Sequence, residues 1–392
     1  MIIMKKRICV VSSNYPSKGR PVYVFVEQLV NTLVDMGEDI SVVAPQSITR
    51  SLFRHISILP YKQEYKTSNG NKYTVYRPYS ISFGKFRRWG GFISDFISRY
   101  FLNKCISEIA PDILYVHFWI NALGVLNFAS KEHKPIFVAC GEGDDAMEEM
   151  MDTISFETKE MLKEKVKGVI CVSSQNRNKC INYDLADKED IVVIPNAVDV
   201  SIFHPNERNN RLRKQLNVND DDFLILFVGS FTERKGCVRL AKAVDQLKDS
   251  QIKIIFIGKP FPGYELQFSC NGIVYRGEME HNNLPDYYLC ADVFVLPTLN
   301  EGCSNAIVEA LACGVPVISS KRPFNEDILN EQNAILVNPE SVDEIANAIS
   351  LLKRDKELLK EKKNYIIQHV KQYSLIDRAK RIRDFIYANV KE

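Results

Sequence analysis

Residues 294–316 decide the fold class, and they read FVLPTLNEGCSNAIVEALACGVP. We predict that an apolar strand ends at Pro297, that a short loop follows, and that a helix capped by Ser304 or Asn305 ends at Gly314. The free amide groups and the dipole at the start of such a helix attract phosphate. The stretch therefore predicts a strand, a loop and a helix with an anion site where the helix begins.

Two glutamates in this stretch are the first candidates for ligand binding. Glu301 and Glu309 are eight residues apart, which on a helix corresponds to about 12 Å at 1.5 Å per residue. The acid pair of a glycoside hydrolase is only about 5 to 9.5 Å apart, so the spacing favours two carboxylates that hold hydroxyls at opposite ends of one long ligand. The alternative is a solvated loop residue and an ordinary charge on a helix face.

The same alternation of short apolar runs and helical patterns extends in both directions from this stretch. Strands buried on both faces read as continuous apolar runs, and helices between them imply parallel strands with right-handed crossovers. Such runs occupy residues 7–12, 40–44, 112–117, 136–139, 168–173, 191–195, 223–229, 253–258, 272–275, 293–297, 316–320 and 334–337. We predict an α/β fold with two Rossmann-like domains, whose parallel sheets face each other across a ligand-binding cleft.

A polar segment flanked by prolines separates the two series of strands. It begins at Asn196–Asp199 and continues through Pro205 into residues 206–222. Such a segment is typical of a hinge between domains. We place the first domain at residues 1–198, the second at 199–375, and a helix at 376–392 that could cross back to the first domain.

Composition excludes several classes of protein. The 392 residues are 45% hydrophobic and 26% charged, which is not typical of a collagen-like, disordered or coiled-coil chain. The formal net charge of +2 gives no global field toward nucleic acid. The ten cysteines form no CxxC pair and no zinc pattern, and no apolar run approaches the roughly 18 residues of a spanning helix. We expect a cytoplasmic protein with free cysteines and without a bound metal.

Charge is concentrated at one end of the sequence. Residues 1–110 contain 16 Lys and Arg against 7 Asp and Glu. Within them, Phe83–Ile93 interleaves aromatic and basic residues, and a helix is predicted over Asp95–Ile109. Basic residues are attracted to anionic lipid and aromatic rings can enter the interface, so the segment is a candidate for peripheral contact with an anionic membrane, with a packed helix and a solvated basic face as the alternative.

The 294–316 stretch resembles the E-x7-E motif of the retaining family 4 (group 1) glycosyltransferases, which adopt the two-domain GT-B fold and act in bacterial polysaccharide and glycolipid biosynthesis. The resemblance extends over nearly the whole chain. Further similar pieces are Val192–Asp199, Val274–Gly277 and Ala291–Pro297. It implies a nucleotide sugar as co-substrate, with a UDP-sugar favoured over a GDP-sugar, and no cofactor.

The second domain opens with the pattern FVGSFTERKG at residues 227–236. The resemblance implies that Arg234 and Lys235 hold the donor diphosphate and that Glu301 orients the sugar, while Glu309 holds ribose hydroxyls. Cations there would stabilise oxygens that gain charge as the glycosidic bond breaks. Many members of the family carry an Arg where this chain has Ser230. The donor-binding residues implied in this way are Gly229, Arg276, Gly302, Cys303, Ser304, Asn305 and Glu309.

The first domain departs further from the family pattern. The loop after the first strand, with Asn14 and Gly19, holds one Gly where the family usually has two. Cys140 and Glu142 stand where relatives often have His-Gly-x-Asp, so a His that reaches the reacting sugar in relatives is replaced. His117 ends a predicted strand and either points into the cleft or satisfies a backbone group. These five residues are the candidates on the acceptor side.

We therefore expect a retaining glycosyltransferase that moves a sugar from a nucleotide-sugar donor to a hydroxyl of a glycan or lipid-linked acceptor, at the inner face of the membrane. One alternative is a sugar-nucleotide epimerase on the same fold, which needs an acid and a base beside the sugar. Another is a non-catalytic scaffold that binds nucleotide sugars. Release of nucleoside diphosphate only when an acceptor is added would separate the transferase from both.

Overall fold

The chain forms two compact units. The computed structural model describes residues 5–17, 19–53, 55–81, 87–141, 153–260 and 267–390, with the backbone alone for residues 87–95. The first unit comprises residues 1–172, 176–194 and 379–392, and the second comprises 173–175 and 195–378. The main boundary thus follows Ile194, where we expected it after residue 198.

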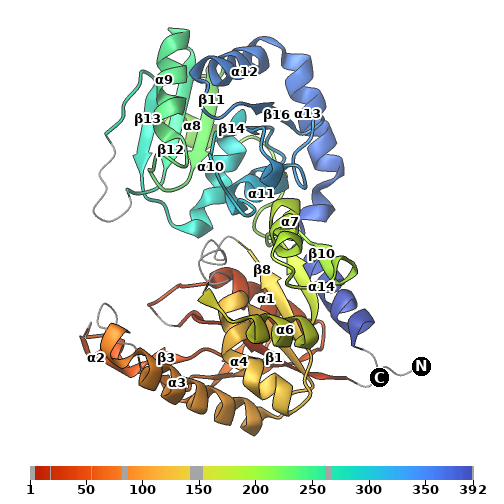
Figure 1. The fold of residues 1–392 in the computed structure, drawn as a ribbon. Helices are drawn as coiled ribbons and strands as arrows, with labels where there is room; N and C mark the ends of the chain where they lie inside the picture. Colours follow the sequence, from red (N-terminus) through yellow and green to blue (C-terminus); the bar gives the residue numbers. More distant parts are fainter. Residues whose placement is uncertain are drawn as a thin grey trace. The chain divides into compact units, whose positions relative to one another are not determined.

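The first unit, which carries the N-terminus in Figure 1, is built on a sheet. Its described strands have the order β10-β9-β8-β7-β1-β2-β5-β4. Neighbouring strands are parallel except β4 and β5. The central strands are buried on both faces, as parallel strands between helices are. The strands are β1 (Arg7–Val11), β2 (Asp39–Val43), β4 (Lys62–Lys66), β5 (Lys72–Tyr76), β7 (Ile113–His117), β8 (Ile136–Cys140), β9 (Val166–Cys171) and β10 (Ile191–Val193).

Helices cover both faces of this sheet. Successive side chains of β1 alternate between two core clusters, Cys9 and Val11 in one and Ile8 and Val10 in the other. The first cluster includes residues of α3, α4, α6 and α7, and the second includes residues of α1 and α14. The bounds are α1 (Val24–Asp35), α3 (Arg87–Ile109), α4 (Trp119–Lys131), α6 (Phe156–Lys165), α7 (Ser174–Asn182) and α14 (Leu375–Asn389).

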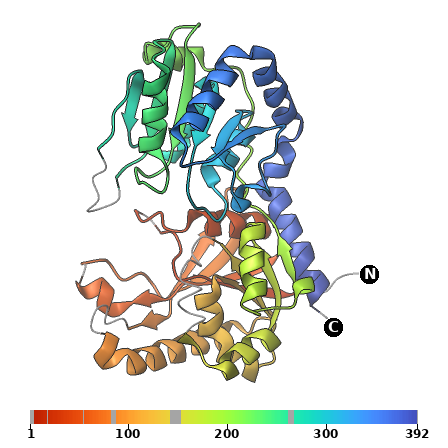
Figure 2. The same cartoon turned by 45° about the horizontal axis from the view of Figure 1, so that its top comes forward.

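The edge of this sheet corrects the prediction of a purely parallel arrangement. Strands β4 and β5 form an antiparallel hairpin around Asn69-Gly70, and β5 then pairs with β2 in parallel. The short strands β3 (Gln46–Ser47) and β6 (Tyr79–Ser80) form a separate parallel pair. Helix α2 (Ile48–Phe53) and α3 both contact β6, and they lie near each other in Figures 1 and 2.

The last helix belongs to the core of the first unit. Three residues of α14, Ala379, Ile382 and Ile386, are at most 1% exposed and pack in the cluster with α1. Helix α14 comes close to the sheet at Gly168 in β9, where a Cβ would lie 2.6 Å from Cε1 of Phe385. Glycine at residue 168 therefore lets α14 lie against the sheet.

The second unit is a parallel α/β sheet with the order β13-β12-β11-β14-β15-β16 (Figure 1). The strands are β11 (Phe223–Val228), β12 (Ile252–Ile257), β13 (Ile273–Gly277), β14 (Val293–Leu296), β15 (Val317–Ser320) and β16 (Ala334–Val337). The helices are α8 (Asn210–Gln215), α9 (Cys237–Leu247), α10 (Leu284–Cys290), α11 (Asn305–Ala312), α12 (Val342–Arg354) and α13 (Lys356–Gln368). Single 3-10 turns are η3 (Lys188–Asp190) in the first unit and η4 (His281–Asn283), η5 (Pro323–Asn325) and η6 (Val370–Tyr373) in the second.

Every strand predicted from an apolar run is present, with ends within two residues of the prediction. The helix predicted near Ser304 begins at Asn305 and ends before Gly314, which has a φ of +79°. Within the described residues, no helix combines the length and the apolar character needed to cross a membrane.

Candidate functional site

The candidate donor site lies where two neighbouring strands of the second unit end. Strand β14 leads into the loop with Thr298 and Glu301, and its parallel neighbour β11 leads into the turn with Arg234 and Lys235. Carboxyl ends of adjacent parallel strands share one edge of a sheet, which is where doubly wound sheets bind ligands. The two family-like segments therefore meet in space.

Gly236 sets the approach of these two segments. It has a left-handed φ of +80° at the start of α9, and a Cβ there would lie 2.4 Å from the carbonyl oxygen of Pro297. Any side chain would push the turn away from the loop. Glycine thus brings Arg234 and Lys235 beside the loop that carries Glu301.

The carboxylate of Glu301 is buried beside both cations. Its Oε1 accepts hydrogen bonds from Lys235 Nζ at 2.5 Å and from the Thr298 hydroxyl at 2.8 Å, and it lies 3.4 Å from Arg234 Nη1. The Glu301 side chain is 1% exposed, against 43% for Arg234. Its Oε2 is buried and accepts no hydrogen bond from the described residues. A ligand hydroxyl could donate to that oxygen.

Glu309 is the second buried carboxylate. Its Oε1 lies 2.9 Å from His281 Nε2, and its Oε2 accepts a hydrogen bond from the Tyr288 hydroxyl at 2.8 Å. The hydrogen bond to Glu309 raises the pKa of His281, and burial is the main cause of the raised pKa of Tyr288. His281 and Tyr288 were missed from the sequence, because no motif connects them to residue 309.

The helical spacing assumed for the two glutamates is wrong. Helix α11 begins at Asn305, so Glu301 precedes it and the rise per residue of a helix does not apply between residues 301 and 309. Ser304 stands at the N-cap position, but its side chain makes no capping hydrogen bond. The hydroxyl therefore leaves the amide groups of the first turn available to another acceptor.

The segment before α11 is fixed by Asn196. Its side-chain amide donates to the carbonyl oxygen of Cys303 and to Oδ1 of Asn305, both at 3.0 Å, and its backbone N–H lies 3.4 Å from Cys303 Sγ. Cys303 is 5% exposed. These bonds hold the chain on either side of Ser304 in one conformation.

Arg276, at the end of β13, lies on an aromatic cluster. Its guanidinium carbon is 4.0 Å from the ring centre of Phe268 and 5.5 Å from that of Phe231, and Nη1 donates to the carbonyl oxygen of Phe268. Gly229 directly follows β11 of the same sheet. Both residues lie at the carboxyl edge, and their donor-binding roles stay predictions.

The acceptor-side candidates lie in the first unit, at separate places. Asn14 lines a cavity of about 330 Å³ at the carboxyl ends of β1, β2 and β5, and Gly19 lies in the turn between Ser17 and Arg20, which line it too. His117 is buried, with its ring 5.1 Å from that of Tyr115.

Cys140 lies in the apolar core, 0% exposed, with its sulfur 3.7 Å from that of Cys180. Cys171 completes a group of three thiols whose sulfur atoms lie within 4.8 Å of one another, the group of described residues that could hold a metal ion. Thiolates are disfavoured in apolar surroundings, which favours a structural role. Glu142 lies outside the described residues.

The basic aromatic segment is described only in part. Residues 83–86 and the side chains of residues 87–93 lie outside the description, and the helix expected from Asp95 begins at Arg87. Beyond it, Phe96 and Tyr100 of α3 are 68% and 57% exposed, and Phe53 of α2 is 80% exposed. Large apolar side chains thus face solvent on two helices that contact the same strand.

Comparisons with known proteins agree with this architecture. Residues 22–202 match the family model described as Glycosyltransferase Family 4, and residues 208–371 match Glycosyl transferases group 1. A provisionally named teichuronic acid biosynthesis glycosyltransferase of Bacillus subtilis (strain 168), TuaC, is 26% identical over 355 residues, 88% of each chain. The UDP-Gal:α-D-GlcNAc-diphosphoundecaprenol α-1,3-galactosyltransferase of Escherichia coli is 26% identical over 55% of this chain and 59% of its own.

Among solved structures, Anabaena HepE in complex with UDP is similar with a TM-score of 0.74 at 15% identity, covering 97% of this chain and 100% of that one. Sucrose-phosphate synthase from Thermosynechococcus elongatus is similar with a TM-score of 0.71 at 17% identity, covering 98% and 99%. These similarities concern the fold. The chain belongs to the group 1, family 4 glycosyltransferases, and its two α/β units are those of the GT-B fold.

Proposed function

We propose that this protein is a retaining glycosyltransferase that moves a sugar from a nucleotide-sugar donor to a hydroxyl of a glycan or lipid-linked acceptor, in cell-surface polysaccharide biosynthesis. The observation that carries the proposal is the buried Glu301 carboxylate, held by Lys235 and Arg234 at the carboxyl edge of the second sheet. Two cations, and a carboxylate with one oxygen that no described residue bonds, suit a ligand that has both phosphate and sugar hydroxyls.

The proposed donor is a UDP-sugar. Anabaena HepE has been solved with UDP and with UDP-glucose, and the E. coli relative is named for UDP-Gal. In this proposal Arg234 and Lys235 contact the diphosphate, and Oε2 of Glu301 accepts a hydrogen bond from the sugar. Glu309 accepts hydrogen bonds from the ribose hydroxyls. When the ligand binds, a ribose hydroxyl replaces His281 as the partner of the Glu309 carboxylate.

Reaction by this site needs no nucleophilic side chain. The acceptor hydroxyl attacks the anomeric carbon on the face that the diphosphate leaves, and a phosphate oxygen takes the hydroxyl proton. The bond between the anomeric carbon and the phosphate oxygen breaks, and nucleoside diphosphate departs. Arg234 and Lys235 act on the leaving oxygens, whose charge rises in the transition state.

Product analysis tests this function. The protein is incubated with UDP-sugars, with and without α-D-GlcNAc-diphosphoundecaprenol, and UDP release and the anomeric configuration of the product are measured. We expect acceptor-dependent UDP release and an α-linked product from an α-linked donor. Conversion of the sugar without acceptor would indicate an epimerase, and binding without turnover of any donor would indicate a scaffold.

Peripheral contact with a membrane is part of the proposal and would place the protein at the cytoplasmic face. It is supported by the +9 formal charge of residues 1–110 and by the exposed Phe53, Phe96 and Tyr100. Attraction between exposed charges and anionic lipid extends about 8 Å at physiological salt, so binding should weaken as salt rises. Sedimentation with anionic and neutral vesicles at two salt concentrations measures this, and failure to bind anionic vesicles at low salt would contradict it.

A further inference from the structure

The cavity of the first unit is lined by cations and hydroxyls. It lies after β1, β2 and β5, where Asn14, Pro45 and Arg77 follow the three strands, and its volume is about 330 Å³. This position is the expected ligand site of a doubly wound sheet, and the volume is within the range of small-molecule sites. Three arginines and six serines line it, and no described aspartate or glutamate does: Arg20, Arg50, Arg77, Ser13, Ser17, Ser47, Ser51, Ser57 and Ser80.

Arg77 is a buried cation with neutral partners. It is 2% exposed, its Nη2 donates to the Tyr65 hydroxyl at 2.6 Å, and its Nη1 donates to Oε1 of Gln63 at 3.3 Å. No described carboxylate forms an ion pair with it. A buried charge is costly unless an opposite charge compensates it, so an anion in the cavity would stabilise this arrangement.

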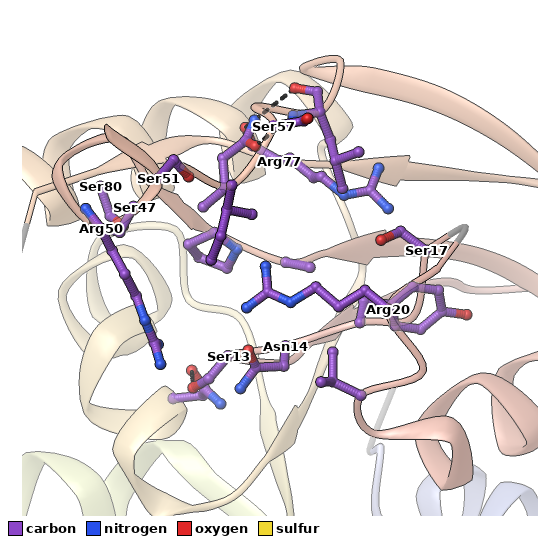
Figure 3. A pocket seen from close by; sticks show the side chains of 18 residues that line it. Ser13, Asn14, Ser17, Arg20, Ser47, Arg50, Ser51, Ser57, Arg77 and Ser80 are labelled. Atoms are coloured by element: carbon purple, nitrogen blue, oxygen red, sulfur yellow. Dashed lines mark hydrogen bonds between the residues drawn. The ribbon is translucent and has the colours of Figure 1, made fainter. Parts of the chain in front are cut away.

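The other two arginines approach from different sides, Arg20 from a loop and Arg50 from a helix. Arg20 follows the turn at Gly19, and its guanidinium group extends into the cavity above Ser13 and Asn14 (Figure 3). Arg50 comes from α2. Neither forms an ion pair with a carboxylate in the part of the chain that the structure describes. The three guanidinium groups therefore place formal positive charge around one space.

The walls of the cavity are held by hydrogen bonds, and none of those between described residues involves the guanidinium groups of Arg20 and Arg50. The Tyr65 hydroxyl that accepts from Arg77 donates to the carbonyl oxygen of Pro16, and the Gln46 side chain bonds both the N–H and the carbonyl oxygen of Leu59. The buried Arg77 is held in place by its own hydrogen bonds, so this cation is preorganised and loses little entropy when an anion binds.

We propose that this cavity binds a phosphate ester group of the acceptor. Several guanidinium groups and hydroxyls converging from different sides match the many oxygens and the double charge of a phosphate ester better than the two oxygens and single charge of a carboxylate. The assignment of this ligand to the acceptor rests on the proposed function. The same phosphate chemistry occurs in a soluble sugar phosphate and in a lipid-linked sugar.

Calorimetric titration of the full chain tests this site. Saturating UDP is present throughout, so that a phosphate probe cannot occupy the proposed diphosphate site. The probes are glucose 1-phosphate, octyl phosphate, glucuronate and glucose. We expect the two phosphates to bind, glucuronate to bind at least about tenfold more weakly, and glucose to give no heat. Tighter binding of octyl phosphate identifies a lipid-linked source, and tighter binding of glucose 1-phosphate a soluble one.

Arg20→Gln and Arg50→Gln should each weaken phosphate binding at least about tenfold. The matched control is Arg7→Gln, at the opposite end of β1, which should leave the affinity unchanged. Arg77→Gln is not required, because loss of a buried cation could unfold the unit. Equal phosphate affinity in all three variants would overturn the proposal, and so would glucuronate binding as tight as that of glucose 1-phosphate.

Measuring the affinity for UDP distinguishes failure of this anion site from failure of the proposed function. UDP affinity should be the same in Arg20→Gln as in the unmodified protein. If UDP binds and neither phosphate does, the anion site is wrong and the proposed function is unaffected. If the phosphates bind at Arg20 but no sugar is transferred from any donor, the anion site is supported and the transferase proposal fails.

Discussion

Replacing Lys235 with Met should destabilise the second unit. Its Nζ lies 2.5 Å from Oε1 of Glu301, and the two side chains are only 15% and 1% exposed. Removing one partner of a buried ion pair costs about 3 to 5 kcal/mol, because the other charge stays buried. Arg234 at 3.4 Å and the Thr298 hydroxyl still contact the carboxylate, so we expect a loss at the lower end, about 3 kcal/mol.

Scanning calorimetry of the full chain measures this loss. For a unit of this size, 1 kcal/mol corresponds to roughly 2 to 4 °C in Tm, so the transition of the second unit should fall by roughly 6 to 12 °C. The matched control is the double variant with Glu301→Gln and Lys235→Met, which removes both charges. Replacement of a whole buried pair is often nearly neutral, so its Tm should lie well above that of Lys235→Met.

The same variants separate stability from catalysis. If Lys235 stabilises the leaving diphosphate, turnover at saturating donor should fall at least about tenfold, or about 1.4 kcal/mol, in Lys235→Met. The double variant should fall at least as far, because it also lacks the Glu301 carboxylate that is proposed to hold the sugar. If the loss of Tm in the double variant equals the sum of the losses in Lys235→Met and in Glu301→Gln, the two side chains do not interact and the buried ion pair is refuted. Full turnover at saturating donor would leave Lys235 a binding residue only.

Three further predictions concern other parts of the molecule. Glu309→Ala should weaken binding of free UDP measured by calorimetry, whereas Glu301→Ala should spare it, and equal losses would contradict the proposed roles. The pKa of His281 is raised above its ordinary 6.5 by its hydrogen bond to Glu309, so the stability that His281 contributes is fully present below pH 6.5 and is lost as the pH rises through the raised value. His281→Gln should therefore lower Tm most at acidic pH, and a pH-independent loss would contradict this. Phe53→Glu should reduce sedimentation with anionic vesicles. The matched control is Phe156→Glu, which should not reduce it, because Phe156 is similarly exposed (73%, against 80% for Phe53) but lies on α6. Equal effects of the two substitutions would show that the α2 surface is not involved.

The parallel part of the fold could be predicted because its strands are continuous apolar runs, such as Phe223–Val228, which is almost wholly buried. The antiparallel edge was missed for the opposite reason. Four of the five residues of β4, KQEYK, are exposed, so the strand has no apolar run to mark it. The Asn69-Gly70 pair was the available signal, since this dipeptide favours a tight hairpin turn.

The site could be predicted at the level of segments but not of contacts. Spacing and resemblance pointed to Glu301, Lys235 and Glu309, and the structure brings Glu301 and Lys235 together. The partners of Glu309 come from residues 281 and 288, which only the folded sheet brings beside α11. The preference of the first cavity for anions could not be predicted from the sequence either, because Arg20, Arg50 and Arg77 lie far apart in the chain, in a loop, in α2 and after β5.

The place of α14 has a consequence for synthesis on the ribosome. The first unit needs Ala379, Ile382 and Ile386 to complete its core, and these residues follow the whole second unit in the chain. Domains generally fold as units while the chain emerges, so residues 5–194 must wait with part of the sheet uncovered until translation has passed residue 386. The second unit consists of residues 195–378 together with residues 173–175. It can therefore finish folding before the first unit, although most of it is translated later. Until α14 arrives, the apolar face around Phe137 and Gly168 is the surface that a chaperone would have to shield.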